Sequence, residues 1–487
     1  MLVQGAVLLT VIVIYSVYLW YKRPHNAPPG PRGFPILGNL PYLQENAHKV
    51  LAKWSKTYGP LMLVRMGREE WLVINDFDTL QKAYLQQRTK FSGQPTSSII
   101  HELSGGSLGI LFADYGGLWS SQRKFSINTL RKFELGKRAM ETEILNETSY
   151  LNEFIRSQNE QPFDIYDVIN KATSNAMCHG IFGKRFDYDN PTFCKLLDLM
   201  GTFHKREIGE SFQMATFYPA LRHVPPFSSN CDTAAKAVQS MRDLVDKIAT
   251  EHEKTYVKDH PRDLIDCFLE NMKTGKDYFT HAQLLQLVTE LFVAGSDTTP
   301  GTIMWCMHTL LNYPEAQGKL RKEIFDVIGS SGIVSWSHKP QLPYTNAFME
   351  EVMRYHTLIP LPIRKVNEDV NILGYFVPKN TMVFPNLWAI HHDSTYFTEP
   401  EKFKPERFID EKGNFVKSDH VIPFSIGSRQ CLGEQLARME VFFLLVSMVQ
   451  KFEFLPDPEA KELPSEEGVP HTITFGTPPF KLIAREI

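Results

Sequence analysis

The sequence predicts a mainly α-helical protein with a small β component, folded as one large domain behind an N-terminal membrane anchor. Two long stretches, residues 281–312 and 433–452, repeat apolar side chains over many helical turns. Segments with the composition of β-strands are short and lie at residues 61–67, 71–75, 370–377 and 381–386. A length of 487 residues is enough for several domains, but no second linker, repeat or low-complexity block follows residue 40.

Residues 2–20 contain no charged side chain, which predicts a membrane-spanning helix. At about 1.5 Å per helical residue, such a stretch spans roughly 28 Å, close to the thickness of a bilayer core. Tyrosine and tryptophan crowd its C-terminal end, and Lys22 and Arg23 follow, so the positive-inside rule places the rest of the chain on the cytoplasmic side. The alternative is a cleaved signal peptide, but neither a charged N-terminal region nor a small-residue cleavage site is evident. We therefore expect an uncleaved anchor at residues 1–23.

Residues 24–40 contain five prolines and three glycines, which predict a stiff, extended spacer between the membrane and the folded domain. The remaining residues, 41–487, are expected to form that domain. The net charge of −3 argues against a nucleic-acid partner. Six cysteines without a CxxC pair or a regular spacing argue against a disulfide framework and a zinc site, and they suit a reducing compartment.

One cysteine, Cys431, has unusual neighbours in PFSIGSRQCLGEQLARMEVFFLL. A thiolate can act as a nucleophile or as a metal ligand. A nucleophile would need a nearby base, and the local residues offer only Arg429 and Glu434. A buried structural thiol is the other alternative for a lone cysteine.

A ligand role to a flat, anionic macrocycle explains more of these neighbours. Gly427 and Gly433 would let the backbone turn tightly and approach the ligand closely. Arg429 could neutralise a propionate, and Phe424 would place an apolar ring beside the sulfur. The helix that begins near Gly433 would direct its positive end and free N–H groups at the thiolate of Cys431.

The string from Phe424 to Gly433, with Gly427, Arg429 and Cys431 between them, resembles the haem-binding loop of the cytochromes P-450. In that family the cysteine thiolate is the axial iron ligand and donates electron density that favours O–O cleavage. The resemblance implies haem b (iron protoporphyrin IX) as the cofactor, with Cys431 as the metal ligand and Phe424, Arg429 and Gly433 as cofactor contacts.

Two further segments fit the same family. Glu351 and Arg354 are three residues apart on a predicted helix, a spacing that contributes little on a protein surface. Arg407, in the segment PERF, follows some fifty residues later, where the family supplies another arginine. The resemblance implies that Glu351, Arg354 and Arg407 form a network that braces the haem-side core without taking part in the chemistry.

Residues 294–301, AGSDTTPG, interrupt an otherwise apolar helix. Thr298 can bond the carbonyl of Ala294, and Pro300 removes an N–H, so both loosen one turn and could open a groove for a small molecule and water. A plain helix break is the alternative on local grounds. The segment resembles the family's oxygen-activation motif, which implies that Ala294 contacts the haem and that Asp297 and Thr298 relay protons through water toward bound dioxygen.

Three more residues resemble the family's contacts to the haem propionates. Trp119 and Arg123 are four apart on one helix face, and Arg364 follows the helix of Glu351. Each arginine alone is a typical surface residue, but together with Arg429 they would form a cationic rim around the propionates. Gln94 departs from the pattern, because related sequences often carry an arginine there, and this propionate contact would be weak or absent.

Residues 123–138 hold six cations and one acid. Lys124, Arg131 and Arg138 are seven apart and would share a stripe if one helix continued past Gly136. A solvated helix face is one interpretation, and a docking patch for an acidic redox partner beside the cysteine loop is the other.

The resemblance covers essentially the whole chain and is closest in style to the microsomal, reductase-dependent enzymes of family 2. It implies a monooxygenase of the endoplasmic reticulum membrane, with its catalytic domain on the cytoplasmic face. Such an enzyme hydroxylates or epoxidises a lipophilic substrate, such as a fatty acid, steroid or xenobiotic, with dioxygen. The electrons would come from NADPH through a separate flavoprotein reductase, with cytochrome b5 as a second candidate donor.

The substrate site would be mainly apolar, with walls from residues 96–113, 292–298, 358–363 and 472–477. Two alternatives share the fold. One is a haem-thiolate isomerase of peroxides, against which the pair Asp297 and Thr298 argues. The other is a non-enzymatic haem sensor, which would need neither the proton relay nor the basic stripe.

Overall fold

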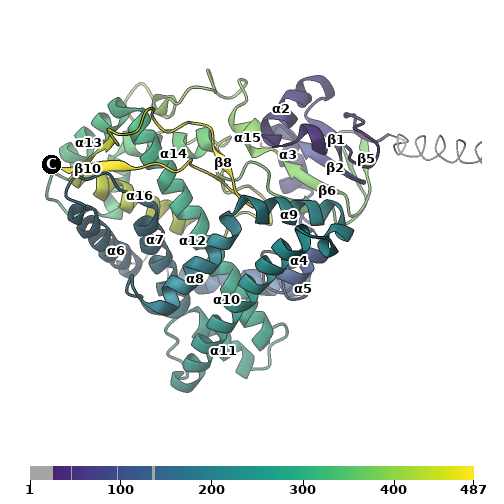
Figure 1. Cartoon of the computed structure of the whole chain (residues 1–487), viewed down its shortest axis with the longest axis horizontal. Helices are drawn as coiled ribbons and strands as arrows, with labels where there is room; N and C mark the ends of the chain where they lie inside the picture. The colour runs from purple at the N-terminus through teal and green to yellow at the C-terminus, as the bar shows by residue number, and fades with distance from the viewer. Residues whose placement is uncertain (1–22, 24–25, 45, 96, 134–137) are drawn as a thin grey trace, which may run out of the picture.

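The structure is a computed structural model that describes residues 23, 26–44, 46–95, 97–133 and 138–487 (Figure 1). The predicted mainly helical class with a small β component is confirmed. Its α-helices are α2 (Ala47–Tyr58), α3 (Phe77–Gln81), α4 (Ser98–Leu103), α5 (Gly117–Phe133), α6 (Arg138–Ser157), α7 (Tyr166–Phe182), α8 (Pro191–Gly201), α9 (Arg206–Phe217), α10 (Phe227–Thr255), α11 (Leu264–Lys273), α12 (His281–Asn312), α13 (Pro314–Val327), α14 (Pro343–His356), α15 (Leu387–His391) and α16 (Glu434–Lys451). Its strands are β1 (Leu61–Met66), β2 (Glu69–Ile74), β3 (Arg364–Lys365), β4 (Val370–Ile372), β5 (Tyr375–Val377), β6 (Met382–Pro385), β7 (Phe452–Pro456), β8 (Val469–Pro470), β9 (Phe475–Gly476) and β10 (Leu482–Glu486).

The two longest predicted helices are confirmed almost to the residue as α12 and α16. The side chain of Thr280 accepts a hydrogen bond from the N–H of Gln283 and so caps the start of α12. Both helices are buried on most faces and share one apolar core with α6, α7 and α14. Figure 1 shows this helical part on one side of the molecule and the sheet with α2 and α3 on the other.

The principal sheet has the strand order β1-β2-β6-β3. Strands β1 and β2 are antiparallel, whereas β6 joins β2 in parallel, so the sheet pairs segments that lie far apart in the sequence. The predicted strand at residues 370–377 is a hairpin instead of one strand. Leu373 and Gly374 both have positive φ, 50° and 82°, and form the two-residue turn between β4 and β5.

The predicted membrane anchor lies outside the described residues, apart from Arg23. Among the helices that the structure describes, none combines the length and the apolar character that a membrane crossing requires. The described part of the proline-rich spacer lies along β1, where Leu63 donates to the carbonyl of Pro29 (2.8 Å) and Asn39 donates to that of Arg65 (2.7 Å). The spacer therefore covers the edge of the principal sheet.

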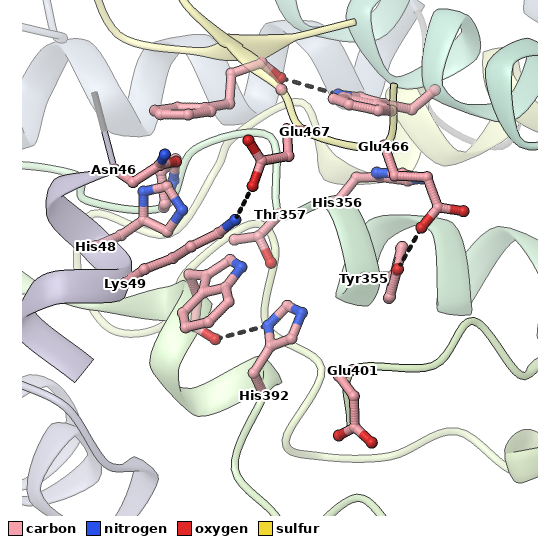
Figure 2. Close-up of a pocket in the computed structure, with 15 residues that line it drawn as sticks. Asn46, His48, Lys49, Tyr355, His356, Thr357, His392, Glu401, Glu466 and Glu467 are labelled. Atoms are coloured by element: carbon pink, nitrogen blue, oxygen red, sulfur yellow. Dashed lines mark hydrogen bonds and ion pairs between the residues drawn. The ribbon is translucent and has the colours of Figure 1, made fainter. Parts of the chain in front are cut away.

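A pocket of about 180 Å³ opens between the start of α2, the end of α14 and α15 (Figure 2). Three of its charged side chains have polar partners inside the pocket. Lys49 pairs with Glu467 (3.3 Å), and Glu466 accepts a hydrogen bond from the hydroxyl of Tyr355 (2.7 Å). Cys431 does not line this pocket, and neither do the predicted proton-relay residues Asp297 and Thr298. The pocket is therefore separate from the predicted haem site.

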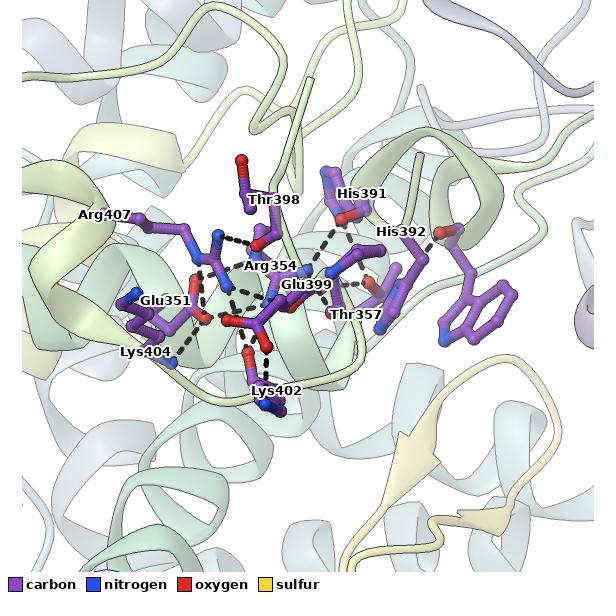
Figure 3. Close-up of polar contacts among 12 residues, drawn as sticks. Glu351, Arg354, Thr357, His391, His392, Thr398, Glu399, Lys402, Lys404 and Arg407 are labelled. Carbon is purple, nitrogen blue, oxygen red and sulfur yellow. Dashed lines mark hydrogen bonds and ion pairs between the residues drawn. The ribbon is translucent and has the colours of Figure 1, made fainter. Parts of the chain in front are cut away.

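A largely buried ion network joins α14 to the segment that follows α15 (Figure 3). Arg354 makes a bidentate pair with Glu351, at 2.7 and 2.8 Å, and Arg407 reaches the same carboxylate at 3.1 Å. Both Glu351 and Arg354 have 0% of their side-chain surface exposed. Arg354 also donates to the carbonyls of His391 and Pro400, so the predicted network is confirmed and every part of it has partners.

We predict that Glu351→Gln destabilises the protein by about 3–5 kcal/mol, because it leaves two buried guanidinium groups without their counter-charge. Urea unfolding followed by circular dichroism measures the loss. Asp326→Asn is the matched control, since it removes an exposed pair with Lys322 and should change stability by less than about 0.5 kcal/mol. Equal effects of the two substitutions would contradict a bracing role for the network.

Candidate functional site

The loop that carries Cys431 is closed by its own backbone. The N–H of Cys431 donates to the carbonyl of Phe424 (3.0 Å). Gly427 has a φ of 87°, and a Cβ there would collide with the carbonyl oxygen of Tyr84, so the position requires glycine. Gly433 is different, because its φ is −94° and a Cβ would meet open space. Gly433 lies in the turn before α16, and its backbone N–H hydrogen-bonds the sulfur of Cys431.

The Cys431 thiol keeps accessible surface, although protein surrounds it on most sides. Burial raises the pKa of this thiol above its ordinary value, and the nearby Glu434 carboxylate raises it further. The N–H of Gly433 and the guanidinium of Arg123 act in the opposite direction but do not prevail. The thiolate form consequently needs a stronger cationic partner, and a bound metal ion would supply one.

Arg429 ties the cysteine loop to residues 92–113. Its guanidinium donates to the carbonyls of Ser92 (2.9 Å), Ile110 (3.1 Å) and Ala113 (2.7 Å), and it lies 4.4 Å from the centre of the Trp119 ring. Burial, followed by the charge of neighbouring Arg364, lowers the pKa of Arg429 to about 9. The three carbonyl groups that hold Arg429 are neutral, and both burial and the charge of Arg364 disfavour the positive charge of Arg429.

Arg123 and Arg364 complete a group of three arginines with Arg429. Arg123 donates to the carbonyl of Gln430 (2.7 Å), which places α5 beside the cysteine loop. Burial lowers the pKa of both Arg123 and Arg364, and the charge of Arg364 lowers that of Arg123 further. Among the described residues, none of the three forms an ion pair with a carboxylate, and the buried Nε of Arg364 has no acceptor. A group with two carboxylates would satisfy this cluster, and the haem propionates fit that description.

Gln94 is the position that departs from the family pattern. Its side chain is buried and binds a backbone carbonyl group of this chain. Its side chain donates to the carbonyl of Leu111, and its N–H donates to Asp114 (3.0 Å). Asp114 in turn pairs with Lys365 (2.7 Å). Gln94 thus fixes the same segment that Arg429 holds.

The oxygen-activation segment lies inside α12, which continues past Pro300, so the alternative of a helix break is wrong. The hydroxyl of Thr298 donates to the carbonyl of Ala294 (2.8 Å), as the sequence predicts. A Cβ at Gly295 would collide with Met177 of α7, so the small size of this residue allows α7 and α12 to pack closely. Ala294 is exposed and Thr298 and Asp297 are partly accessible.

Sequence reasoning missed His204, which ends the 3₁₀-helix η3 (Thr202–His204). Its Nε2 lies 2.5 Å from Oδ1 of Asp297. The two residues are 93 positions apart, and no motif surrounds the histidine, so the sequence held no signal for this contact.

Sequence reasoning also missed two buried acids, although each interrupts an apolar helical run. Glu290 of α12 accepts hydrogen bonds from the N–H groups of Ile110 (2.6 Å) and Leu111 (2.8 Å) and so fixes the segment that Arg429 binds. Glu440 of α16 is 2% exposed and contacts Thr299 of α12. Burial raises the pKa of Glu440 to about 8. An acid inside such a run is the signal that could have found both.

The described residues also contain one compact group of candidate ligands for a metal ion, His252, Asp263 and Asp266. His252 Nε2 lies 2.7 Å from Oδ2 of Asp263, which leaves no room for an ion between them. Arg262 binds both oxygens of Asp266. This group is an ion-pair cluster that stabilises the start of α11.

Comparison with known proteins agrees with this geometry. The family model for cytochrome P450 matches residues 28–484. Cytochrome P450 2U1 of Rattus norvegicus is 34% identical over 96% of this chain and 92% of its own length. Cytochrome P450 2D3 of Rattus norvegicus is 33% identical over 98% and 96%, and cytochrome P450 2C28 of Mesocricetus auratus is 34% identical over 97% and 96%.

The chain therefore belongs to the cytochrome P450 family, and its relatives support the family 2 resemblance. It is an enzyme, a P450 monooxygenase. Membership of the family implies a haem-thiolate cofactor, dioxygen and a small-molecule substrate.

We predict that Glu440→Gln stabilises the protein at pH 8 and has little effect near pH 4.5. The unfolded chain loses the Glu440 proton near the ordinary pKa of 4.5, whereas the folded protein keeps it up to about pH 8. The wild type therefore loses unfolding free energy, relative to a glutamine that cannot ionise, as the pH rises between these values. Urea midpoints at pH 5, 6.5 and 8 measure this difference.

The control for that experiment is Glu459→Gln, which changes an exposed carboxylate. Its stability difference from the wild type should stay constant across the same pH range. A constant difference for Glu440→Gln as well would show that Glu440 ionises normally in the folded protein.

Proposed function

We propose that this chain is a membrane-anchored, reductase-dependent monooxygenase that inserts one atom of dioxygen into a lipophilic substrate by hydroxylation or epoxidation. The substrate would be a fatty acid, a steroid or a foreign lipophile. The observation that carries the proposal is the meeting of three arginines beside the thiol of Cys431, none of which pairs with a carboxylate of the described residues. This arrangement suits a dianionic macrocycle whose iron takes a sulfur ligand, and we assign haem b to it.

In this proposal Cys431 supplies the iron ligand, and Arg123, Arg364 and Arg429 bind the propionates. Trp119 lies against two of these guanidinium groups, at 4.4 Å from Arg429 and 5.6 Å from Arg123, and keeps them in place. Bound haem supplies dioxygen activation, which the electron density of the thiolate favours.

Other residues complete the proposed contacts to the cofactor. Phe424 lies under Arg438, 5.0 Å from its guanidinium, and contributes an apolar wall beside the sulfur. Gly433 contributes its N–H, and Ala294 contributes the accessible surface of α12.

Asp297 and Thr298 are the proposed proton-handling residues. Both have accessible surface on α12, whereas Phe292, also in the predicted wall, is buried against Phe182 of α7. The substrate wall from α12 is therefore narrower than the sequence predicts and centres on Ala294, Asp297 and Thr298. The side chains of the predicted wall segment 358–363 are all apolar, which suits a lipophilic substrate.

We further propose that the enzyme lies on the cytoplasmic face of the endoplasmic reticulum membrane and takes electrons from an NADPH-dependent flavoprotein reductase, with cytochrome b5 as an additional donor. The uncharged N-terminal stretch and the basic side chains of α5 support this. Lys124 and Arg131 are exposed on α5, which Arg123 joins to the cysteine loop. The third member of the predicted stripe, Arg138, begins α6, and the helix continuity that the stripe needs falls on residues 134–137, outside the described residues.

Absorption of the reduced protein with and without carbon monoxide tests the haem-thiolate assignment. We expect a strongly red-shifted Soret band from the wild type and its loss in Cys431→Ser. Haem without the shift in the wild type would contradict the thiolate ligand. Folded protein that takes up no haem at all would overturn the proposed function.

We predict that Lys124→Glu with Arg131→Glu raises the reductase concentration needed for half-maximal turnover several-fold at low salt. Added salt should shrink the difference, because it screens exposed charges. Lys247→Glu with Lys254→Glu is the matched control, since these exposed lysines are also seven residues apart, on α10. An equal effect of both double variants would favour the solvated-face interpretation of α5.

A further inference from the structure

The contact between His204 and Asp297 joins the predicted acid of α12 to η3. His204 Nε2 lies 2.5 Å from Oδ1 of Asp297, and each side chain is 23% exposed. Within the described part of the chain, this is the one polar contact that the Asp297 carboxylate makes. One carboxylate oxygen is therefore held by an imidazole, and Oδ2 remains available to water or to Thr298.

The neighbours of His204 hold its ring in a defined place. The hydroxyl of Tyr166 lies 3.5 Å from Nδ1, and the ring of His471 stacks on that of His204 with centroids 4.8 Å apart. Thr472 donates to the carbonyl of Phe203 through its N–H (3.4 Å) and its hydroxyl (2.6 Å), which fixes η3 against the 471–474 turn.

The titratable groups that face His204 are Asp297 of α12, Tyr166 of α7 and His471 of the turn. Burial and the charge of Asp297 raise the pKa of Tyr166, so its hydroxyl stays protonated and can either donate to Nδ1 or accept from it. A carboxylate only accepts hydrogen bonds, so Nε2 carries the hydrogen in the contact with the Asp297 carboxylate. Burial and the charge of His204 lower the pKa of His471, so this second ring is neutral.

We propose that His204 is a positioning residue that also supplies protons to Asp297, and that it links the acid of α12 to solvent at the edge of η3. The inference rests on the proposed role of Asp297 and extends it, because an acid that gives up a proton in each turnover must regain one. The accessible fraction of His204 provides the route to water.

The proton balance is simple. A protonated imidazole transfers the hydrogen on Nε2 to Oδ1 of the Asp297 carboxylate, after that residue has released a proton toward the reaction site. The imidazole, now neutral with its hydrogen on Nδ1, regains a proton from solvent at the vacated Nε2 once the carboxyl group has rotated to present its new proton to the reaction site. One proton leaves the solvent for each one delivered, and no electron moves at either side chain.

The competing explanation is a static latch, in which His204 only holds η3 on α12. His204→Gln separates the two, because glutamine keeps an N–H donor but cannot carry a proton. His281→Gln is the matched control. It alters a second histidine–aspartate pair, with Asp246 at 2.6 Å, at the start of the same helix.

The experiment measures the fraction of NADPH electrons that reach product, with saturating reductase, between about pH 6 and 8, where imidazoles ordinarily titrate. We expect wild-type coupling to fall as the pH rises across this range. We expect His204→Gln to be several-fold less coupled at pH 6 and insensitive to pH, with its thermal midpoint unchanged. Coupling in His204→Gln that equals that of the wild type and of His281→Gln would overturn proton supply in favour of the latch.

A second measurement does not depend on turnover. Histidine ring nitrogens labelled with ¹⁵N give signals for His204, assigned by their absence in His204→Gln, in the reduced, carbon monoxide-bound protein. Asp297→Asn should shift these signals, and unchanged signals would overturn the contact. Failure of this inference can be told apart from failure of the proposed function. If the proposed function fails, the carbon monoxide spectrum of the wild type lacks the red-shifted band of a thiolate ligand.

Discussion

The site depends on how one segment, residues 92–113, is held against the cysteine loop. Arg429 takes three of its carbonyl groups, and Glu290 takes two of its N–H groups from the opposite side. A backbone that is bound through both donors and acceptors has little freedom to move. The segment thereby joins α12 to the loop of Cys431, so the helix and the thiol keep a fixed relation although they lie far apart in the sequence.

Helix α12 combines packing and chemistry by using different faces. Gly295 allows α12 to pack close to Met177 of α7, and Glu290 binds the backbone N–H of Ile110 in the segment that Arg429 holds. Thr298 is bonded back to Ala294 within the helix. Its side chain therefore needs no outside partner, which leaves this stretch accessible. Asp297 differs from Thr298, because one of its carboxylate oxygens contacts a residue outside α12, His204 of η3.

The sequence predicts local features well, because helical periodicity and fixed spacings are encoded in neighbouring residues. The ends of α12 and the hydrogen bond of Thr298 follow from such signals. The network of Glu351, Arg354 and Arg407 was expected only through the family resemblance. The space around a glycine is less predictable, because it depends on which element packs against it: a Cβ at Gly295 would meet Met177 of α7, and a Cβ at Gly427 would meet the carbonyl group of Tyr84. The partners His204 and Glu290 are set by tertiary contacts, which leave no pattern in a single sequence.

Two groups of arginines in this chain differ in how their positive charges are balanced. The difference indicates where the anionic cofactor would bind. Arg354 and Arg407 lie against the buried carboxylate of Glu351. This carboxylate and nearby backbone carbonyl groups accept the hydrogen bonds of both guanidinium groups. Arg123, Arg364 and Arg429 are gathered so that their charges repel, and within the described residues their hydrogen bonds go to backbone carbonyl groups. Collecting cations in this way is unfavourable for the protein alone. The arrangement becomes favourable when a dianionic group lies between them, so the same charges that oppose folding would bind the cofactor.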